Sequence, residues 1–568
     1  MHDRILRGGT VVDGTGAAPR EADVAIRDGR IAEIGRVAGS AHEEVDVRGK
    51  LVTPGFVDIH THYDGQATWD PHLAPSCYHG VTTVVMGNCG VGFAPVQADQ
   101  HTFLIELMEG VEDIPGTALH EGIQWEWETF PEYLDALDKR RFGMDIATQV
   151  PHGAVRAYVM GERGANNEPA NAEDIAAMAA IVKEGVAAGA LGFSTSRTIA
   201  HTAISGEPVP GTFAAEDELF GIGRVLGELD KGLFEVAPAG AEGMDIAAPK
   251  QELDWMLRLS KEIRRPVTFA MLQVDSAPEL WRELLELSAE AVAGGADVFP
   301  QIAGRPFGML IGHQTVIHPF ADRPGFAKLL DLPFEERIAK LREPEIKRQI
   351  LSERNEETLS MLLSQLGRFF PMGDPPNYEP AYEDSIEAIA KREGIPAEEF
   401  LYDRMLERDG RELFLVPVLN YSHLTADPLR EMMYHPRAAL GLGHRGAHCG
   451  IICDASIQTF MLTHWVRDRS RGERIPIEFA VKRMSKDTAD LYGFTDRGTL
   501  APGMRADMNV IDHANMKLEP PEMLFDLPAG GQRFMQRARG YERTLVAGVD
   551  VIRDDEVTGE LPGRLVRS

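Results

Sequence analysis

Helical segments that run directly into short apolar strands are the feature that most restricts how this chain can fold. Residues 174–197, DIAAMAAIVKEGVAAGALGFSTSR, read as a helix capped by Asn171 or Asp174, then a glycine break and a strand. Residues 280–306, LWRELLELSAEAVAGGADVFPQIAGRP, repeat this plan. Strands that alternate with helices of this length are typical of βα units in a parallel sheet. The sequence therefore predicts an α/β fold, with a (β/α)8 TIM-like barrel as the leading form.

Both ends of the chain have a different character, because they are rich in short alternating strands. Near the start, Asp28-Gly29 lies between two apolar runs, which is typical of a tight hairpin. We expect residues 1–54 and 490–568 to form one small β-sandwich domain, and residues 55–489 to form the barrel. A charged helical stretch interrupts the barrel pattern, and we interpret residues 321–414 as a helical cap insertion near the mouth of the site.

The composition excludes several classes of partner. The 568 residues carry a formal net charge of −30, from 88 acidic and 58 basic side chains. Such a surface repels nucleic acid and anionic membranes. We find no secretory apolar region and no stretch of about 18 uncharged apolar residues, so we expect a cytoplasmic protein. The four cysteines do not suggest a disulfide framework, and each is either a buried thiol or a ligand.

Two histidines follow the first predicted barrel strand in VDIHTHYDG, residues 57–65. Side chains two residues apart in a strand point to the same face, so His60 and His62 offer half a site for a divalent metal, zinc being the commonest. The second strand ends in GNCG, where Cys89 can add a thiolate. The alternatives are a chance pair of histidines on a wet strand face and a buried structural cysteine.

Residues after two further strands can bind an anionic or carbonyl group. These are His152, Arg156 and Arg197, and the planar guanidinium of arginine suits a substrate carboxylate. The alternatives are that His152 is an ordinary loop histidine and that the segment ending in Arg197 is an ordinary helix N-cap. Arg305 is a third candidate for the substrate's negative end. Asp64 and Asn88, beside the metal motifs, and His448 are further candidate substrate-binding residues.

The segment ALGLGHRGAHCGIICDAS, residues 439–456, is the densest cluster of candidate ligands after the first strand. His444, His448 and Asp454 follow an apolar strand there. Its small residues let the backbone come close to a ligand. We expect this cluster to lie beside His60 and His62 and to complete the same site.

PGFVDIHTHYD, GVTTVVMGNCGVGFAP, HGAVR, GFSTSR and DRGTLAPGMRADMNVID, taken in this order, resemble the amidohydrolase superfamily in its D-aminoacylase-like branch. The resemblance covers both terminal segments and most of the barrel. It implies a metal-dependent barrel, a β-sandwich made by both chain ends, and amide hydrolysis by metal-activated water. It also implies that His60, His62 and Cys89 contribute to the metal site.

The departures from this family concern the chemistry itself. The family places a histidine ligand at the end of the fifth strand and another at the end of the sixth, but GLFEVAPAG (232–240) and PVTFAMLQVD (266–275) contain none. The family's general base, an aspartate after the eighth strand, is replaced by His444. A neutral imidazole can accept a proton or bind the metal, so His444 is a replacement base or a third ligand, and Asp454 is a weaker candidate base.

We therefore predict a hydrolase that cleaves a C–N amide bond of a small N-acylated, carboxylate-bearing substrate, with one zinc ion more readily expected than two. The chain is expected to form a homo-oligomer. Two alternatives remain open at this stage. The same barrel can run non-hydrolytic chemistry such as cyclisation, isomerisation or decarboxylation, or the chain can be a catalytically degenerate binding protein.

Overall fold

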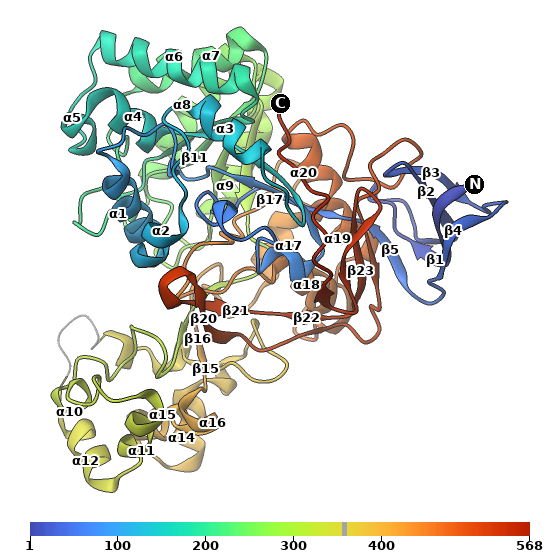
Figure 1. Ribbon diagram of the computed structural model, residues 1–568. Helices are drawn as coiled ribbons and strands as arrows, with labels where there is room; N and C mark the ends of the chain where they lie inside the picture. Colours follow the sequence, from blue (N-terminus) through green and yellow to red (C-terminus); the bar gives the residue numbers. More distant parts are fainter. Residues whose placement is uncertain (355–360) are drawn as a thin grey trace.

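A closed parallel barrel forms the centre of the computed structural model, which describes residues 1–354 and 361–568 (Figure 1). Its strands are β6 (Phe56–Asp58), β7 (Val81–Met86), β8 (Asp145–Thr148) continued after Gln149 by β9 (Val150–Pro151), β10 (Gly192–Ser196), β11 (Leu233–Ala237), β12 (Val267–Ala270), β13 (Val298–Ile302) and β17 (Ala439–Leu440). The His62 amide donates to the Arg445 carbonyl at 2.7 Å and joins the first strand to the last. The predicted fold class is confirmed.

Helices on the outside of the barrel bury the apolar backs of its strands. They are α1 (His101–Glu112), α2 (Gly116–Gly122), α3 (Phe130–Asp138), α4 (His152–Met160), α5 (Glu162–Ala165), α6 (Ala172–Ala188), α7 (Glu216–Leu229), α8 (Ala248–Ile263), α9 (Leu280–Glu290), α17 (Asp427–Tyr434), α18 (Ile457–Phe460), α19 (Ile477–Met484) and α20 (Lys486–Leu491). At the start of α6, Asn171 is the N-cap and Asp174 completes a capping box, so both predicted residues act together. Within the described ranges, no helix is both long enough and apolar enough to cross a membrane.

Strands from both chain ends form one sheet at the side of the barrel (Figure 1). They are β1 (His2–Val11), β2 (Arg20–Arg27), β3 (Arg30–Gly35), β4 (Ala41–Asp46), β5 (Leu51–Pro54), β18 (Met508–Ile511), β23 (Tyr541–Val546), β24 (Val549–Arg553) and β25 (Glu556–Val557). Val52 of β5 lies opposite Val510 of β18 in the antiparallel register. The β2–β3 hairpin turns at Asp28 and Gly29, both with positive φ, as predicted. The domain limits 1–54, 490–568 and 55–489 stay predictions.

Shorter strands link the C-terminal segment back to the barrel. β19 (Lys517–Leu518) pairs with β22 (Ala538–Arg539), and β20 (Glu522–Leu527) pairs with β21 (Gly531–Met535). The Phe534 amide of β21 donates to the Cys449 carbonyl, in the loop after the last barrel strand. The C-terminal region therefore contributes to the surroundings of the barrel mouth.

The insertion between β13 and β17 has its own apolar core. It contains a small antiparallel sheet of β14 (Phe307–Ile311), β16 (Phe414–Leu419) and β15 (Phe370–Pro371). Its helices are α10 (Pro324–Ala327), α11 (Phe334–Leu341), α12 (Pro344–Ser352), α14 (Ile386–Glu393), α15 (Ala397–Met405) and α16 (Glu407–Gly410). The helices project away from the barrel at the lower left of Figure 1. Ile338, Leu341 and Leu401 are among its buried side chains. The limits 321–414 stay a prediction, and residues 355–360 of the stretch predicted to be helical lie outside the described residues.

Candidate active site

His60 lies just beyond the carboxyl end of β6 and is held by a side chain from β13. Its Nδ1 is 3.0 Å from Gln301 Oε1, and its ring is fully buried. Because a carboxamide oxygen only accepts hydrogen bonds, Nδ1 carries the proton and Nε2 keeps its lone pair. Nε2 lies 3.3 Å from Cys89 Sγ. Gln301 thus fixes the orientation of the ring and leaves Nε2 available to a metal ion.

His62 is the least satisfied polar side chain of the group. It is 1% exposed, and among the described residues neither of its ring nitrogens has a hydrogen-bond partner. Glu112 Oε1, at the end of α1, lies 3.3 Å from Nδ1 without hydrogen-bond geometry. Buried polar atoms without partners are costly. The ring is therefore suited to a ligand that accepts its lone pair.

Cys89 occupies a tight loop after β7, where its own φ is +54°. Its backbone amide donates to Glu235 Oε2 of β11 at 3.0 Å. The glycines around it are sterically required: a Cβ on Gly87 would lie 2.4 Å from the Gln149 carbonyl, and one on Gly90 would lie 2.7 Å from the Ser196 amide nitrogen. The GNCG sequence therefore brings the thiol to the end of the strand.

His444 enters from the loop after β17, at φ +43°. Its ring centroid is 4.4 Å from that of His60, and the ring lies parallel to that of His62 at 5.6 Å. Its Nδ1 is 3.0 Å from the Leu442 carbonyl, so Nδ1 donates and Nε2 keeps a lone pair.

These side chains bring four donor atoms together at the barrel mouth. One donor atom each from His60, His62, Cys89 and His444 can be chosen so that all lie within 4.8 Å of one another. Three imidazoles and a thiol are a donor set that zinc accepts. Burial lowers the pKa of His60 to about 4 and holds the pKa values of His62 and His444 well below their usual value. These rings are therefore neutral, which is the form that binds metals.

Unlike the imidazoles, the thiol of Cys89 is not in its metal-binding form when no cation is present. Burial, with the carboxylates of Glu235 and Glu112 nearby, raises the pKa of Cys89 well above its usual value. A thiolate at this position needs a cation beside it, and a divalent metal supplies that charge. The four residues therefore fit a metal ion better than they fit an empty, protonated cluster.

A cavity of about 270 Å³ lies beside these donors. Cys89, His444, His448 and Asp454 line it, together with His201, Glu242 and Thr198. The rest of its wall is apolar and is formed by Val111, Ala200, Ala237, Ala241, Ala270, Leu272, Phe307, Val418, Leu419, Leu442 and Ile452. The ends of β11 and β12 reach the cavity as Ala237 and Ala270. The two strand ends expected to lack histidine ligands therefore present small apolar side chains.

A family profile described as the Amidohydrolase family matches residues 43–552. The chain belongs to the amidohydrolase family. A D-aminoacylase from Alcaligenes xylosoxydans xylosoxydans is 27% identical over 99% of this chain and 97% of its own length. An N-acyl-D-glutamate deacylase from the same organism is 32% identical over 44% of this chain and 46% of its own.

Solved structures give the same placement. A D-aminoacylase structure, described as defining a novel subset of amidohydrolases, superposes with a TM-score of 0.66 at 25% identity and covers 100% of both chains. An N-acyl-D-glutamate deacylase from Bordetella bronchiseptica, complexed with zinc and a phosphonate inhibitor, has a TM-score of 0.65 at 24% identity and supports the fold. The predicted membership of the D-aminoacylase-like branch is confirmed.

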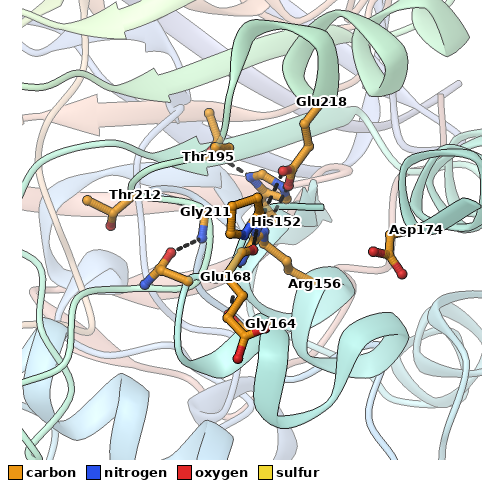
Figure 2. A network of polar contacts seen from close by, with 12 residues as sticks. His152, Arg156, Gly164, Glu168, Asp174, Thr195, Gly211, Thr212 and Glu218 are labelled. Carbon is orange, nitrogen blue, oxygen red and sulfur yellow. Dashed lines mark hydrogen bonds and ion pairs between the residues drawn. The ribbon is translucent and has the colours of Figure 1, made fainter. Parts of the chain in front are cut away.

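Two predicted substrate-binding residues of this amidohydrolase belong to a buried network (Figure 2). His152 Nε2 and Arg156 Nε each lie 2.9 Å from Glu218 Oε1, and His152 Nδ1 lies 2.8 Å from Thr195 Oγ1. The other two nitrogens of the guanidinium also donate hydrogen bonds, Nη1 to the Gly164 carbonyl and Nη2 to the Glu168 carbonyl. Neither His152 nor Arg156 lines the cavity. The network ties α4 to α7 and β10, so the geometry favours a structural role.

The other two arginines are also engaged in ion pairs. Arg197 pairs through Nε with both oxygens of Glu252, at 2.8 and 3.1 Å. Arg305 donates from Nη2 to Asp454 Oδ1 at 2.7 Å, and its guanidinium stacks 3.7 Å from the ring centroid of Tyr378. Asp454 lines the cavity, but Arg197 and Arg305 do not. The geometry thus does not support the expectation that these arginines hold a substrate carboxylate.

Asp64 and Asn88 lie near the metal motifs without lining the cavity. Asn88 Nδ2 donates to the Thr61 and Val85 carbonyls, and its Oδ1 accepts from Gln149. It therefore fixes the loop that carries Cys89. Burial raises the pKa of Asp64 to about 7.

Several residues around the site were not predicted from the sequence, namely Glu112, His201, Glu235 and Gln301, together with Thr198 and Glu242 of the cavity wall. Gln301 and Glu235 are polar residues inside apolar strands, and that break in the pattern could have identified them. Glu112 and His201 carry no such signal, because only the fold brings the end of α1 and the loop after β10 to the barrel mouth.

Proposed function

We propose that this amidohydrolase cleaves a C–N amide bond of a small N-acylated, amino-acid-like substrate with the help of one bound zinc ion. The observation that carries the proposal is the convergence of His60, His62, Cys89 and His444 beside a cavity of about 270 Å³ at the carboxyl end of a barrel. Family membership and the D-aminoacylase relatives support the reaction class. A substrate carboxylate is not part of this proposal, because each of the three candidate arginines already pairs with a carboxylate of the protein and none of them lines the cavity.

The chain's own residues define how the metal would be held. His60, His62 and Cys89 are the ligands that the two motifs supply, and His444 is the fourth donor. A zinc ion there supplies Lewis-acid polarisation of a carbonyl and lowers the pKa of water. The donor set has no histidine from β11 or β12, and its four atoms would be enough to hold one zinc ion.

If His444 is a metal ligand, it cannot also act as the general base, so another group has to accept the proton of the attacking water. Asp454 lines the cavity, and burial raises its pKa to about 7, despite the opposing charge of Arg305. Its Oδ1 accepts from Arg305, which leaves Oδ2 to accept a proton from water. A carboxyl group that titrates near neutral pH suits general base catalysis. We assign the base to Asp454 and the fourth ligand to His444.

Four protein ligands also give one reason to keep a second candidate. Catalytic zinc sites usually hold three protein ligands and leave a position open, whereas four are typical of structural sites. If His444 stays bound throughout, the metal stabilises the barrel mouth, and the chain acts as a binding protein or through non-hydrolytic chemistry. Cytoplasmic localisation and homo-oligomerisation stay predictions that fractionation and light scattering can test.

Metal analysis of the purified protein, combined with hydrolysis assays on N-acetylated amino acids and their amides, tests the proposal. We expect about one zinc per chain, loss of hydrolysis in chelator and its return with zinc. In a His60→Ala/His62→Ala variant, kcat/KM should fall by more than the 10- to 100-fold that is usual for loss of an outer partner of a metal ligand.

A His313→Ala variant is the matched control, because His313 is equally buried, also has two unpaired ring nitrogens among the described residues, and lies in the insertion. It should keep both zinc and activity. Full activity in chelator, or in the double variant, would reject metal-dependent hydrolysis. Stoichiometric zinc without turnover of any amide would favour the structural-metal alternative.

A further inference from the structure

The cavity beside the metal donors has an uneven distribution of charge. Eleven apolar side chains form most of its wall, and the carboxylates that face it are those of Glu242 and Asp454. Glu242 lies in the loop between β11 and α8, and Asp454 lies in the loop after β17. Among the described residues, the lining includes no lysine and no arginine.

These two carboxylates are not equivalent. When Asp454 is ionised, its charge is offset by the buried guanidinium of Arg305, at 2.7 Å. Glu242 Oε2 accepts a hydrogen bond from Thr198 Oγ1 at 2.5 Å, which positions the group without neutralising it. Within the described chain, no hydrogen bond engages Glu242 Oε1. Glu242 therefore presents an uncompensated negative charge and a free acceptor to whatever occupies the cavity.

The apolar wall of the cavity strengthens the interaction of the Glu242 charge with a bound ligand. Charges that face one another across a space with low-dielectric walls interact more strongly than they do in water. A ligand carboxylate beside Glu242 would meet a like charge, and a ligand N–H would meet a free acceptor. The side groups of the ligand would contact Leu272, Phe307 and Leu419, which favour an apolar group.

We propose that this site selects substrates whose end beyond the scissile amide is uncharged or cationic and donates a hydrogen bond to Glu242, with an apolar side group. The substrate class is thus an N-acylated amino-acid amide or amine and not a free N-acyl amino acid. This inference rests on the proposed function for the reaction, but it concerns only which ligands the cavity accepts.

An isosteric pair of test compounds isolates the charge. N-acetylleucinamide and N-acetylleucine differ by one carboxamide in place of one carboxylate, and both enantiomers of each are used with the zinc-loaded enzyme. We expect kcat/KM for acyl-bond hydrolysis to be at least about tenfold higher for the amide, which corresponds to ~1.4 kcal/mol. Added salt should reduce the ratio if part of the discrimination is electrostatic.

Glu242→Gln should lower the amide-to-acid ratio at least threefold by improving the acid. Glu207→Gln is the matched control, because it removes the same charge from the neighbouring exposed loop and does not line the cavity. Its ratio should stay unchanged. Equal or better turnover of N-acetylleucine, with a ratio that Glu242→Gln does not move, would overturn the inference.

Titration calorimetry with the same compounds separates this inference from the proposed function. If neither compound is hydrolysed, the proposed function fails for this pair, and the ratio of their dissociation constants then decides the inference. Tighter binding of the amide that depends on Glu242 would support it. Tighter binding of the acid, or no binding of either, would reject it.

Discussion

The thiol of Cys89 is the donor that distinguishes the proposed metal site from a simple histidine cluster. It lies 3.3 Å from His60 Nε2, and its pKa is raised when no cation is present. A metal ion at the four donors would therefore hold a thiolate and release a proton on binding. This change at one residue can be observed without an activity assay.

Cobalt substitution tests the thiolate ligand directly. Protein loaded with Co²⁺ should show an intense near-ultraviolet sulfur-to-cobalt charge-transfer band, and Cys89→Ala should abolish it. Cys77→Ala is the control, since Cys77 is also buried but is not part of the donor group, and it should retain the band. A band that survives in Cys89→Ala would remove this cysteine from the metal site.

At the residue scale, the sequence was informative where the chemistry is local. His60, His62 and Cys89 could be predicted because short motifs at strand ends place them, and His444 because it stands in a cluster of small residues and histidines. Gln301 stands out only as a polar residue in an apolar strand, and Glu112 has no local signal, so the partners of both could not be assigned. Their contacts with His60 and His62 join positions 241 and 50 residues apart, and such pairings exist only once the barrel is closed.

At the scale of elements, one carboxylate joins α7 to α4. Glu218 accepts from His152 and Arg156, as Figure 2 shows. Burial would raise the pKa of Glu218, but these hydrogen bonds and the charges of the two partners outweigh burial and hold the pKa at about 2. A folded-state pKa below the usual 4.5 means that the ionised carboxylate stabilises the fold above that pH. This stability is lost as the pH falls from about 4.5 through about 2.

Glu218→Gln should therefore destabilise the protein at pH 7, by about 3–5 kcal/mol for a broken buried pair. The difference from wild type should shrink as the pH approaches about 2, because the wild-type carboxyl is then protonated as well. Urea unfolding at pH 7, 4 and 3 measures it. Glu228→Gln is the control on the same helix, since its ion pair with Lys183 is exposed and should contribute less than about 1 kcal/mol. A pH-independent difference for Glu218→Gln would contradict the assignment.

The helices and strands themselves were predicted best where the sequence alternates between helical and strand patterns. The helix at 172–188 and the strand at 192–196 follow from a capping box, apolar periodicity and a glycine break, all within one window of sequence. The roles of His152 and Arg156 were harder to assign. Their position after a strand resembles that of a substrate-binding pair, and only the partner Glu218, which is 62 residues from Arg156, reveals the internal network.

At the scale of the whole molecule, the two chain ends are attached to the barrel through buried charges as well as through the shared sheet. The β-rich ends were predictable from composition and turns. The return of the last residues to the barrel was not: the Phe142 amide donates to Gly563, and Ile146 pairs with Leu565, at the edge of β8. A short segment without a strong strand pattern gives no indication of which edge it will join.

Asp145 is the residue on which this attachment converges. It is fully buried on β8 and accepts hydrogen bonds from Arg497, at 2.7 Å, from Arg505, at 3.0 Å, and from the Arg564 amide, at 2.9 Å. Asp145→Asn keeps the shape but removes the charge that faces two buried guanidinium groups. Breaking a buried pair of this kind costs about 3–5 kcal/mol.

We therefore expect Asp145→Asn to lower the melting temperature and to make the peptide bond after Arg564 sensitive to trypsin under native conditions, because the tail loses its anchor before the barrel unfolds. Mass spectrometry of the early digest measures this. Asp138→Asn removes a half-exposed carboxylate 3.6 Å from Arg567 and should change neither property. If Asp145→Asn lowered the melting temperature while its tail stayed resistant, the anchor would lie in the strand pairing at Phe142 and Ile146 and not in the charge cluster.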